Sequence, residues 1–170
     1  MGKIEIVDNC LYPRRYIILN YNGKNPFRLL KAVTSKIRPY FHLKPGQFSN
    51  YRINYDDAGE PAFFFLRWWV VREFSRWSRM HVEMKVNGEE FKTTKEGWFA
   101  FEIEASLITE FTGWGVFLKP IWYFYTYIFY NKLKREYLFK CRSMVMGFMD
   151  EIKKEFSLKT DQAERLETVG

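Results

Sequence analysis

Residues 79–86 read RMHVEMKV, so polar and apolar side chains alternate without a break. Successive side chains of a β-strand point to opposite faces of its sheet, and this alternation therefore predicts a strand with one buried and one wetted face. It runs straight into Asn87 and Gly88, the pair that two-residue hairpin turns prefer. In the resulting register Lys85 would lie opposite Glu90, a favourable pairing of charges. The chain is therefore expected to build its sheet from antiparallel strands.

Further strand patterns extend this sheet to about six to seven strands. Short β-branched and aromatic runs occupy residues 3–7 and 14–21, and alternating runs occupy 48–55 and 99–107. The run AFFFLRWWVVREFSRW at 62–77 fits both a buried strand and a helix. Its content of Phe, Trp and Val favours an extended chain, so we interpret it as a strand.

Two segments show helical spacing instead. Apolar residues recur every three or four positions from Phe27 to Arg38, and Pro39 is expected to end this short helix. From about Pro120 to Phe156 apolar residues again recur every three or four positions, with charged residues, mostly Lys and Arg, on the opposite side. This second pattern predicts a long C-terminal helix whose apolar stripe packs on the sheet.

The start of that helix also raises the question of a membrane. The segment FLKPIWYFYTYIFYNKLKREYLFK, residues 117–140, opens with aromatic and aliphatic side chains and closes with Lys and Arg. A transmembrane helix needs about 20 apolar residues, but Lys119 and Pro120 interrupt the run and its tyrosines favour an interface. Packing on the sheet is the preferred interpretation. An interfacial helix on anionic lipid stays open as the other, with Phe139 and Met146 as the residues that a membrane or partner would contact.

Length and charge bound the remaining options. A chain of 170 residues suits one domain, which we place at 1–157, followed by a flexible polar tail at 158–170. The net charge of +7 favours anionic partners such as nucleic acid, acidic lipid or an acidic protein. Cys10 and Cys141 lie far apart, and the N-terminal residues lack a signal-peptide pattern. We therefore expect a cytoplasmic protein with free thiols, with peripheral contact to a membrane surface as an option.

The order of these elements, a strand, a short helix, a run of antiparallel strands and a long C-terminal helix, resembles the helix-grip arrangement of the START and Bet v 1-like (SRPBCC, polyketide cyclase-like) superfamily. The resemblance covers nearly the whole chain in element order. It implies an α+β fold in which a curved antiparallel sheet grips the C-terminal helix and leaves a hollow for an apolar or amphipathic, lipid-like ligand. The side chains predicted by period to wall this hollow are Tyr51, Ile53, Trp69, Val71, Met80, Val82, Met84, Phe99, Phe101, Ile103, Tyr130, Tyr137, Met144 and Phe148.

The same side chains also describe a solid core, which stays open as the simpler interpretation. A different surface arises in LRWWVVREFSRWSR, where arginines alternate with aromatic residues. Such a surface could stack bases and bind phosphates, as in a basic RNA- or ribosome-associated protein. Its four arginines are Arg67, Arg72, Arg76 and Arg79.

Little in the sequence indicates catalysis or a metal. His42 and His81 lie outside any Cys, His or carboxylate spacing that binds zinc, and we expect neither a metal nor a cofactor. Glu102, Glu104 and Glu110 are best explained as cross-strand partners of Lys and Arg. The leading hypothesis is a non-catalytic protein that binds an apolar or amphipathic small molecule between sheet and helix. An RNA-associated protein and a cyclase-like enzyme acting in the same hollow are the alternatives.

Overall fold

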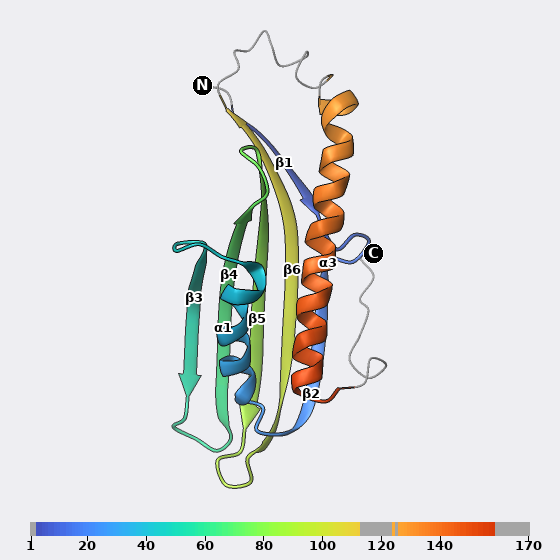
Figure 1. Cartoon of the computed structure of the whole chain (residues 1–170). Helices are drawn as coiled ribbons and strands as arrows, with labels where there is room; N and C mark the ends of the chain where they lie inside the picture. The colour runs from blue at the N-terminus through green and yellow to red at the C-terminus, as the bar shows by residue number, and fades with distance from the viewer. Residues whose placement is uncertain (1–2, 113–123, 125, 159–170) are drawn as a thin grey trace.

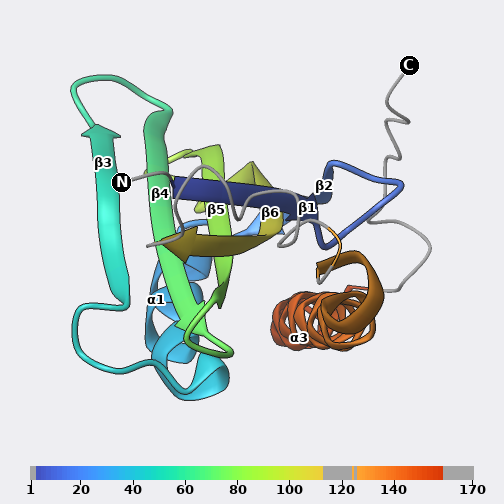
Figure 2. The ribbon, with the colours of Figure 1, turned by 90° about the horizontal axis from the view of Figure 1, so that it is seen from above.

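The computed structural model of the chain describes residues 3–112, 124 and 126–158. Within these residues six strands form one antiparallel sheet. Helices α1 (Arg28–Phe41) and α3 (Asn131–Glu155) both lie on the same face of the sheet (Figures 1 and 2). A short π-helical turn, η2 (Thr126–Tyr130), leads into α3. The predicted α+β class, with a short helix after the N-terminal strands and a long C-terminal helix, is confirmed.

The sheet has the strand order β1-β6-β5-β4-β3, with β2 also paired to β6. β1 pairs with the second half of β6 and β2 with its first half, so these two strands share one edge of the sheet while β3 forms the other. The strands are β1 (Lys3–Asn9), β2 (Tyr16–Lys24), β3 (Phe48–Asp56), β4 (Ala62–Glu73), β5 (Ser78–Glu90) and β6 (Glu96–Thr112). The interpretation of residues 62–77 as mainly strand is thus confirmed by β4.

The hairpin turn predicted at Asn87 and Gly88 is wrong. β5 continues through both residues to Glu90, and the turn lies in residues 91–95. Gly88 is needed for packing, because a side chain there would collide with the backbone carbonyl of Trp98 on β6. The extra length also lets β5 stay paired with β4 on its other side as far as Glu90. Pairing with two neighbours has therefore outweighed the local turn preference.

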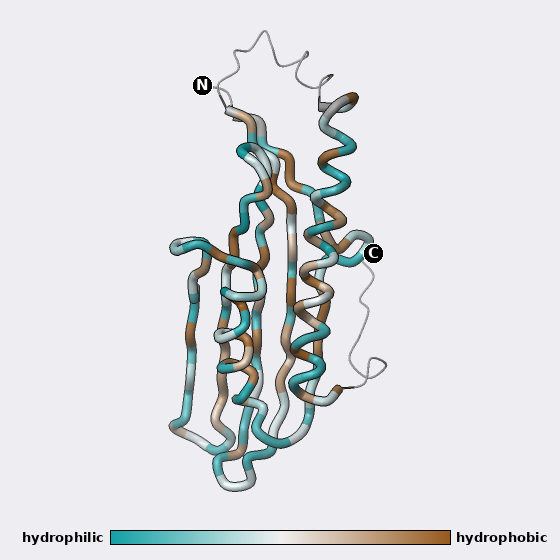
Figure 3. The backbone as a smooth tube through the Cα atoms, in the orientation of Figure 1, coloured by the Kyte–Doolittle hydropathy of each residue, from teal (hydrophilic) through white to brown (hydrophobic). Residues whose placement is uncertain are grey.

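The core lies between the sheet and the two helices. Tyr40 and Phe41 at the end of α1 and Phe148 of α3 form a ring cluster with centroid distances of 5.1–5.2 Å. Hydrophobic and hydrophilic segments alternate along α3, as expected for a helix with one buried side (Figure 3).

None of the helices in the described segments combines the length and apolar character that a membrane span requires. Most of the apolar run at 111–130 and the tail from residue 159 lie outside the described residues.

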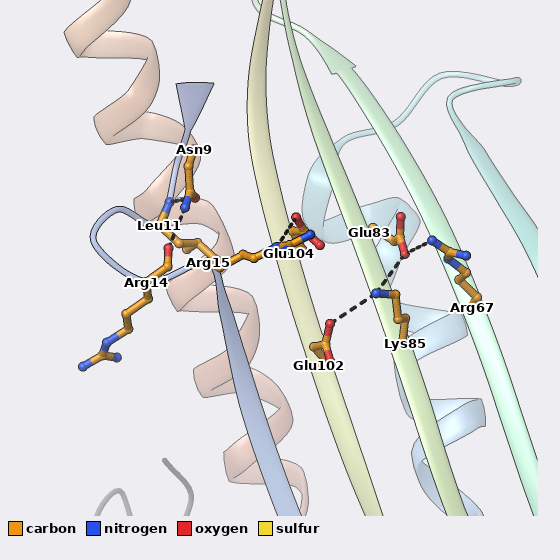
Figure 4. Close-up of polar contacts among 9 residues, drawn as sticks. All are labelled: Asn9, Leu11, Arg14, Arg15, Arg67, Glu83, Lys85, Glu102 and Glu104. Atoms are coloured by element: carbon orange, nitrogen blue, oxygen red, sulfur yellow. Dashed lines mark hydrogen bonds and ion pairs between the residues drawn. The ribbon is translucent and has the colours of Figure 1, made fainter. Parts of the chain in front are cut away.

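Cys10 and Cys141 are joined by a disulfide, so the expectation of free thiols is wrong. The bond links the loop after β1 to the middle of α3, with 5.9 Å between the two Cα atoms. Two turns earlier on the helix, Lys134 also pairs with Asp8 of β1 at 2.8 Å. Asn9 shapes the loop by accepting the N–H of Leu11 at 2.8 Å (Figure 4). The C-terminal helix is therefore fastened covalently to the edge of the sheet.

Candidate functional site

The largest group of predicted wall residues fills the core. The side chains with no exposed surface are Met80, Val82, Met84, Phe99, Phe101, Ile103 and Phe148. They belong to one contiguous cluster of buried residues that also includes the inner sides of α1 and α3. At these positions the space between sheet and helices is occupied by protein side chains, as the solid-core interpretation expects.

Other predicted wall residues lie away from that space. Trp69 and Val71 point to the outer face of the sheet, opposite the helices, because each is paired with an outward residue of β5. Ile53 faces the helix side but is 63% exposed, since it lies on the edge strand β3. Tyr51 lies in β3, and its side chain falls outside the described part of the structure. Tyr130 packs with Phe111 and Trp77 in a separate small cluster. Their roles as ligand contacts stay predictions.

The last two predicted residues, Tyr137 and Met144, lie half-buried on α3 beside an open groove. The groove runs between the end of α1, the end of β4 and the middle of α3, and has a volume of about 480 Å³. That volume falls within the range of small-molecule sites. The residues that line the groove are Pro39, Tyr40, His42, Arg72, Lys140 and Met144.

Two cations and a pair of rings dominate one side of this groove. The Arg72 guanidinium lies 6.0 Å and the Lys140 ammonium 5.4 Å from the centre of the Phe74 ring. The Phe74 ring in turn stacks on Tyr137 at 5.4 Å. No carboxylate of the described residues forms an ion pair with either cation, whereas Arg67 and Arg79 on the outer face of the sheet both have such a partner. The groove therefore offers free positive charge next to an apolar surface.

The other side of the groove carries Tyr40. Burial raises the pKa of its hydroxyl, and the nearby carboxylates of Glu151 and Asp150 raise the pKa further. The hydroxyl therefore stays protonated at neutral pH and can donate a hydrogen bond. Gly147 on α3 makes room for it, because a side chain at that position would collide with the Tyr40 hydroxyl.

The four arginines of the nucleic-acid hypothesis do not share one face. Arg67 and Arg79 point outward from the sheet and form ion pairs, Arg79 with Glu110 at 2.8 Å. Arg76 lies in the loop after β4 and its guanidinium stacks on Trp77 at 5.0 Å. Arg72 points to the helix side, where it belongs to the groove. Their role in binding nucleic acid stays a prediction.

The outer face of the sheet is instead crossed by a row of alternating charges on β4, β5 and β6 (Figure 4). In this row Arg67 pairs with Glu83, which also pairs with Lys85 at 3.3 Å, and Lys85 pairs with Glu102 at 3.3 Å. Burial alone would lower the pKa of Lys85, but the carboxylates of Glu102 and Glu83 outweigh it and raise the pKa. Glu104 pairs with Arg15 at 3.5 Å. The interpretation of these glutamates as structural charge partners is confirmed.

Sequence reasoning missed four residues of the groove, which are Pro39, Tyr40, His42 and Lys140. Pro39 was expected to end the first helix, but α1 continues through it to Phe41, and His42 then turns the chain with a φ of 50°. Residues 39–42 consequently lie against α3 rather than in a free loop. No spacing in the sequence connects this helix end with Arg72 and Lys140, which come from two other elements.

No protein-family model matches the chain, and a comparison with curated proteins finds no match either. The arrangement itself, a large antiparallel sheet with a C-terminal helix packed on one face, is compatible with a helix-grip fold.

Proposed function

We propose that the protein is a non-catalytic binding protein for an amphipathic, lipid-like molecule with an anionic head group. We further propose that its arrangement is a variant of the helix-grip fold of START and Bet v 1-like proteins. In this variant the ligand lies in the groove between α1, β4 and α3, because the space beneath the sheet is already filled. The head group is held by Arg72 and Lys140, and the apolar part lies against Met144.

The observation that carries this proposal is a pair of cations beside an apolar surface for which the described part of the chain supplies no carboxylate partner. A carboxylate or phosphate can accept charge-assisted hydrogen bonds from both cations. The neutral Tyr40 hydroxyl supplies a third donor. An uncharged apolar molecule would leave these donors unused, so the groove favours a ligand with both an anionic and an apolar part.

Two measurements test the proposal. Native mass spectrometry of the purified protein should detect co-purified amphipathic molecules. Isothermal titration should then show that oleate binds more tightly than oleyl alcohol, which has the same tail without the charge. Failure to bind oleate, together with protein free of any bound lipid, would refute the proposal. An absorbance ratio at 260 to 280 nm that is high and falls in salt would instead support the RNA-associated alternative.

A second proposal concerns an anionic membrane surface as a partner. Before α3, Phe124, Tyr127 and Ile128 are 66%, 78% and 49% exposed. The exposed basic residues Lys132 and Arg135 follow on the next turns. An apolar helix end followed by basic side chains suits shallow insertion among anionic lipids. Of the two residues first considered for this role, Phe139 is 76% exposed, whereas Met146 packs against the core.

Vesicle sedimentation tests the membrane proposal independently of the groove. The protein should sediment with vesicles that contain phosphatidylserine and not with vesicles of phosphatidylcholine alone. Equal behaviour with both vesicles would exclude the charge-dependent contact.

A further inference from the structure

The strand β3 forms an open edge of the sheet. It pairs with β4 on one side, and no described strand pairs with it on the other. Figure 2 places β3 beyond α1, so that neither helix covers it. An edge of this kind presents unpaired backbone N–H and C=O groups, which are a template for another strand.

The same edge exposes an apolar patch on its helix side. Ile53 is 63% exposed, Tyr55 51% and Phe27 43%. The rings of Phe27 and Tyr55 lie 5.5 Å apart in an edge-to-face contact. On the same face, the side chains of the neighbouring strand β4 are buried. The patch on β3 is exposed because nothing covers it from the open edge of the sheet.

We propose that a second copy of this chain covers the edge, through antiparallel pairing of the two β3 strands about a two-fold axis at Asn54. In this register Ile53 lies opposite Tyr55 of the second copy, on the helix side of the joined sheet. Arg52 lies opposite Asp56 of the second copy, on the outer side. By symmetry each of these pairs occurs twice, as an isologous interface requires.

The residues of β3 select this register over its neighbours. With the axis on Ile53, Arg52 would lie opposite Asn54 and its charge would have no partner across the axis. With the axis on Tyr55, Ile53 would lie opposite Asp57, which places an apolar side chain against a carboxylate. Only the register centred on Asn54 brings opposite charges and apolar side chains together at once. This self-complementarity is the reason to assign the edge to a second copy rather than to an unrelated strand.

The irregularity in the pairing of β3 with β4 is compatible with such an interface. The register shifts between Asn50 and Arg52, and the five residues from Arg52 to Asp56 then pair regularly with β4. The proposed contact uses only this regular segment. The bulge would limit the new pairing to that length, because bulged residues disrupt a ladder.

Cross-linking tests the axis directly. In the variant Asn54→Cys the new thiols of two copies would face each other, and mild oxidation should give a covalent dimer. The native cysteines do not interfere, since they are joined to each other. The control is Asn20→Cys, because Asn20 is also an exposed asparagine on an edge strand, β2. Light scattering of the unmodified protein should give twice the monomer mass of 20.7 kDa.

Charge variants test the register. Arg52→Asp places like charges opposite each other twice per dimer, and we expect it to weaken dimerisation about tenfold. Adding Asp56→Asn should recover much of that loss, because it removes the repulsion between the two carboxylates. The local structure should be kept, since the Oδ1 of Asp56 accepts the N–H of Ala58 at 3.0 Å and the side-chain oxygen of an asparagine can accept it as well. If the two residues had only structural roles within one copy, the double variant should dimerise more weakly than Arg52→Asp alone.

Three results would overturn the inference. A monomer mass at every concentration excludes a second copy and leaves the edge to a strand of another protein. Cross-linking of Asn20→Cys as efficient as that of Asn54→Cys shows that the thiols meet by random collision. A double variant no better than Arg52→Asp alone excludes the register. None of these results bears on ligand binding in the groove, which lies at the opposite end of α1.

Discussion

Arg72 at the end of β4 reaches the C-terminal helix, where its guanidinium donates to the sulfur of Met144 over 3.3 Å. A thioether is a weak acceptor, so this contact fixes the position of the guanidinium without satisfying it. The Phe74 ring supports the same cation and that of Lys140. The groove thus holds a positioned cation that is ready for a stronger acceptor.

The first prediction removes both charges of the groove. A hydrogen bond to a charged group contributes roughly 1.5–3 kcal/mol, and solvent screening at an open site reduces this contribution. We therefore expect the double variant Arg72→Gln and Lys140→Gln to bind oleate about tenfold more weakly. Isothermal titration gives the affinity, and its dependence on salt should shrink in the variant.

The matched control is Lys132→Gln. Lys132 is an exposed lysine of the same helix but does not line the groove. It removes one positive charge, as the single variant Lys140→Gln does, so an equal loss of affinity in these two single variants would show a general electrostatic effect rather than a site.

The second prediction supplies an internal competitor. In Met144→Glu the new carboxylate would lie within reach of Arg72 and pair with it. Oleate binding should then be lost, while the midpoint of thermal unfolding should stay close to that of the unmodified protein, because the position is only half-buried. The variant Met144→Leu, which removes the sulfur and adds no charge, should keep its affinity for oleate. Unchanged binding in Met144→Glu would place the ligand elsewhere.

Strands and the long helix could be predicted from the sequence because their signals are local. The alternation in β5 and the three-to-four spacing in α3 both report which side of one element is buried. The hairpin at Asn87 and Gly88 failed for the opposite reason. The glycine is required by a neighbouring strand that lies far away in the sequence, and a turn preference cannot show that contact.

The groove and the disulfide also depend on distant contacts. Tyr40, Arg72 and Lys140 come from three elements, and each has an ordinary local pattern. Cys10 and Cys141 meet only because the loop after β1 crosses the middle of α3. Pairings of this kind follow from how the helix lies on the sheet, and that placement is a property of the whole fold.

The third prediction concerns the disulfide. Its cysteines are 131 residues apart, so the closed loop is long. The chain-entropy argument assigns such a bond about 3 to 5 kcal/mol of the free energy of unfolding. We expect the variant with both cysteines changed to serine to unfold at a lower urea concentration, with its free energy of unfolding reduced by this amount. Denaturation of the unmodified protein with a reducing agent should give the same loss, and alkylation under denaturing conditions without reductant should label neither cysteine. Labelling of both would contradict the bond.

The fourth prediction follows from the ion pairs that join the two helices. Glu155 at the end of α3 pairs with Arg28 at the start of α1 and with Lys36, the latter at 3.2 Å. Hydrogen bonds from Arg28 and then Lys36 lower the pKa of the Glu155 carboxyl below its usual 4.5. Because the folded pKa lies below the unfolded one, the stabilisation is present above pH 4.5 and is lost as the pH falls through the folded value.

The variant Glu155→Gln should accordingly be less stable than the unmodified protein at pH 7, and the two should converge in acid. Urea denaturation followed at a series of pH values between neutrality and about pH 3 measures the difference directly. Glu136→Gln is the control, since Glu136 is an exposed glutamate of the same helix and its variant should follow the unmodified protein throughout. A difference between Glu155→Gln and the unmodified protein that persists unchanged into acid would mean that the side chain acts through packing rather than through its charge.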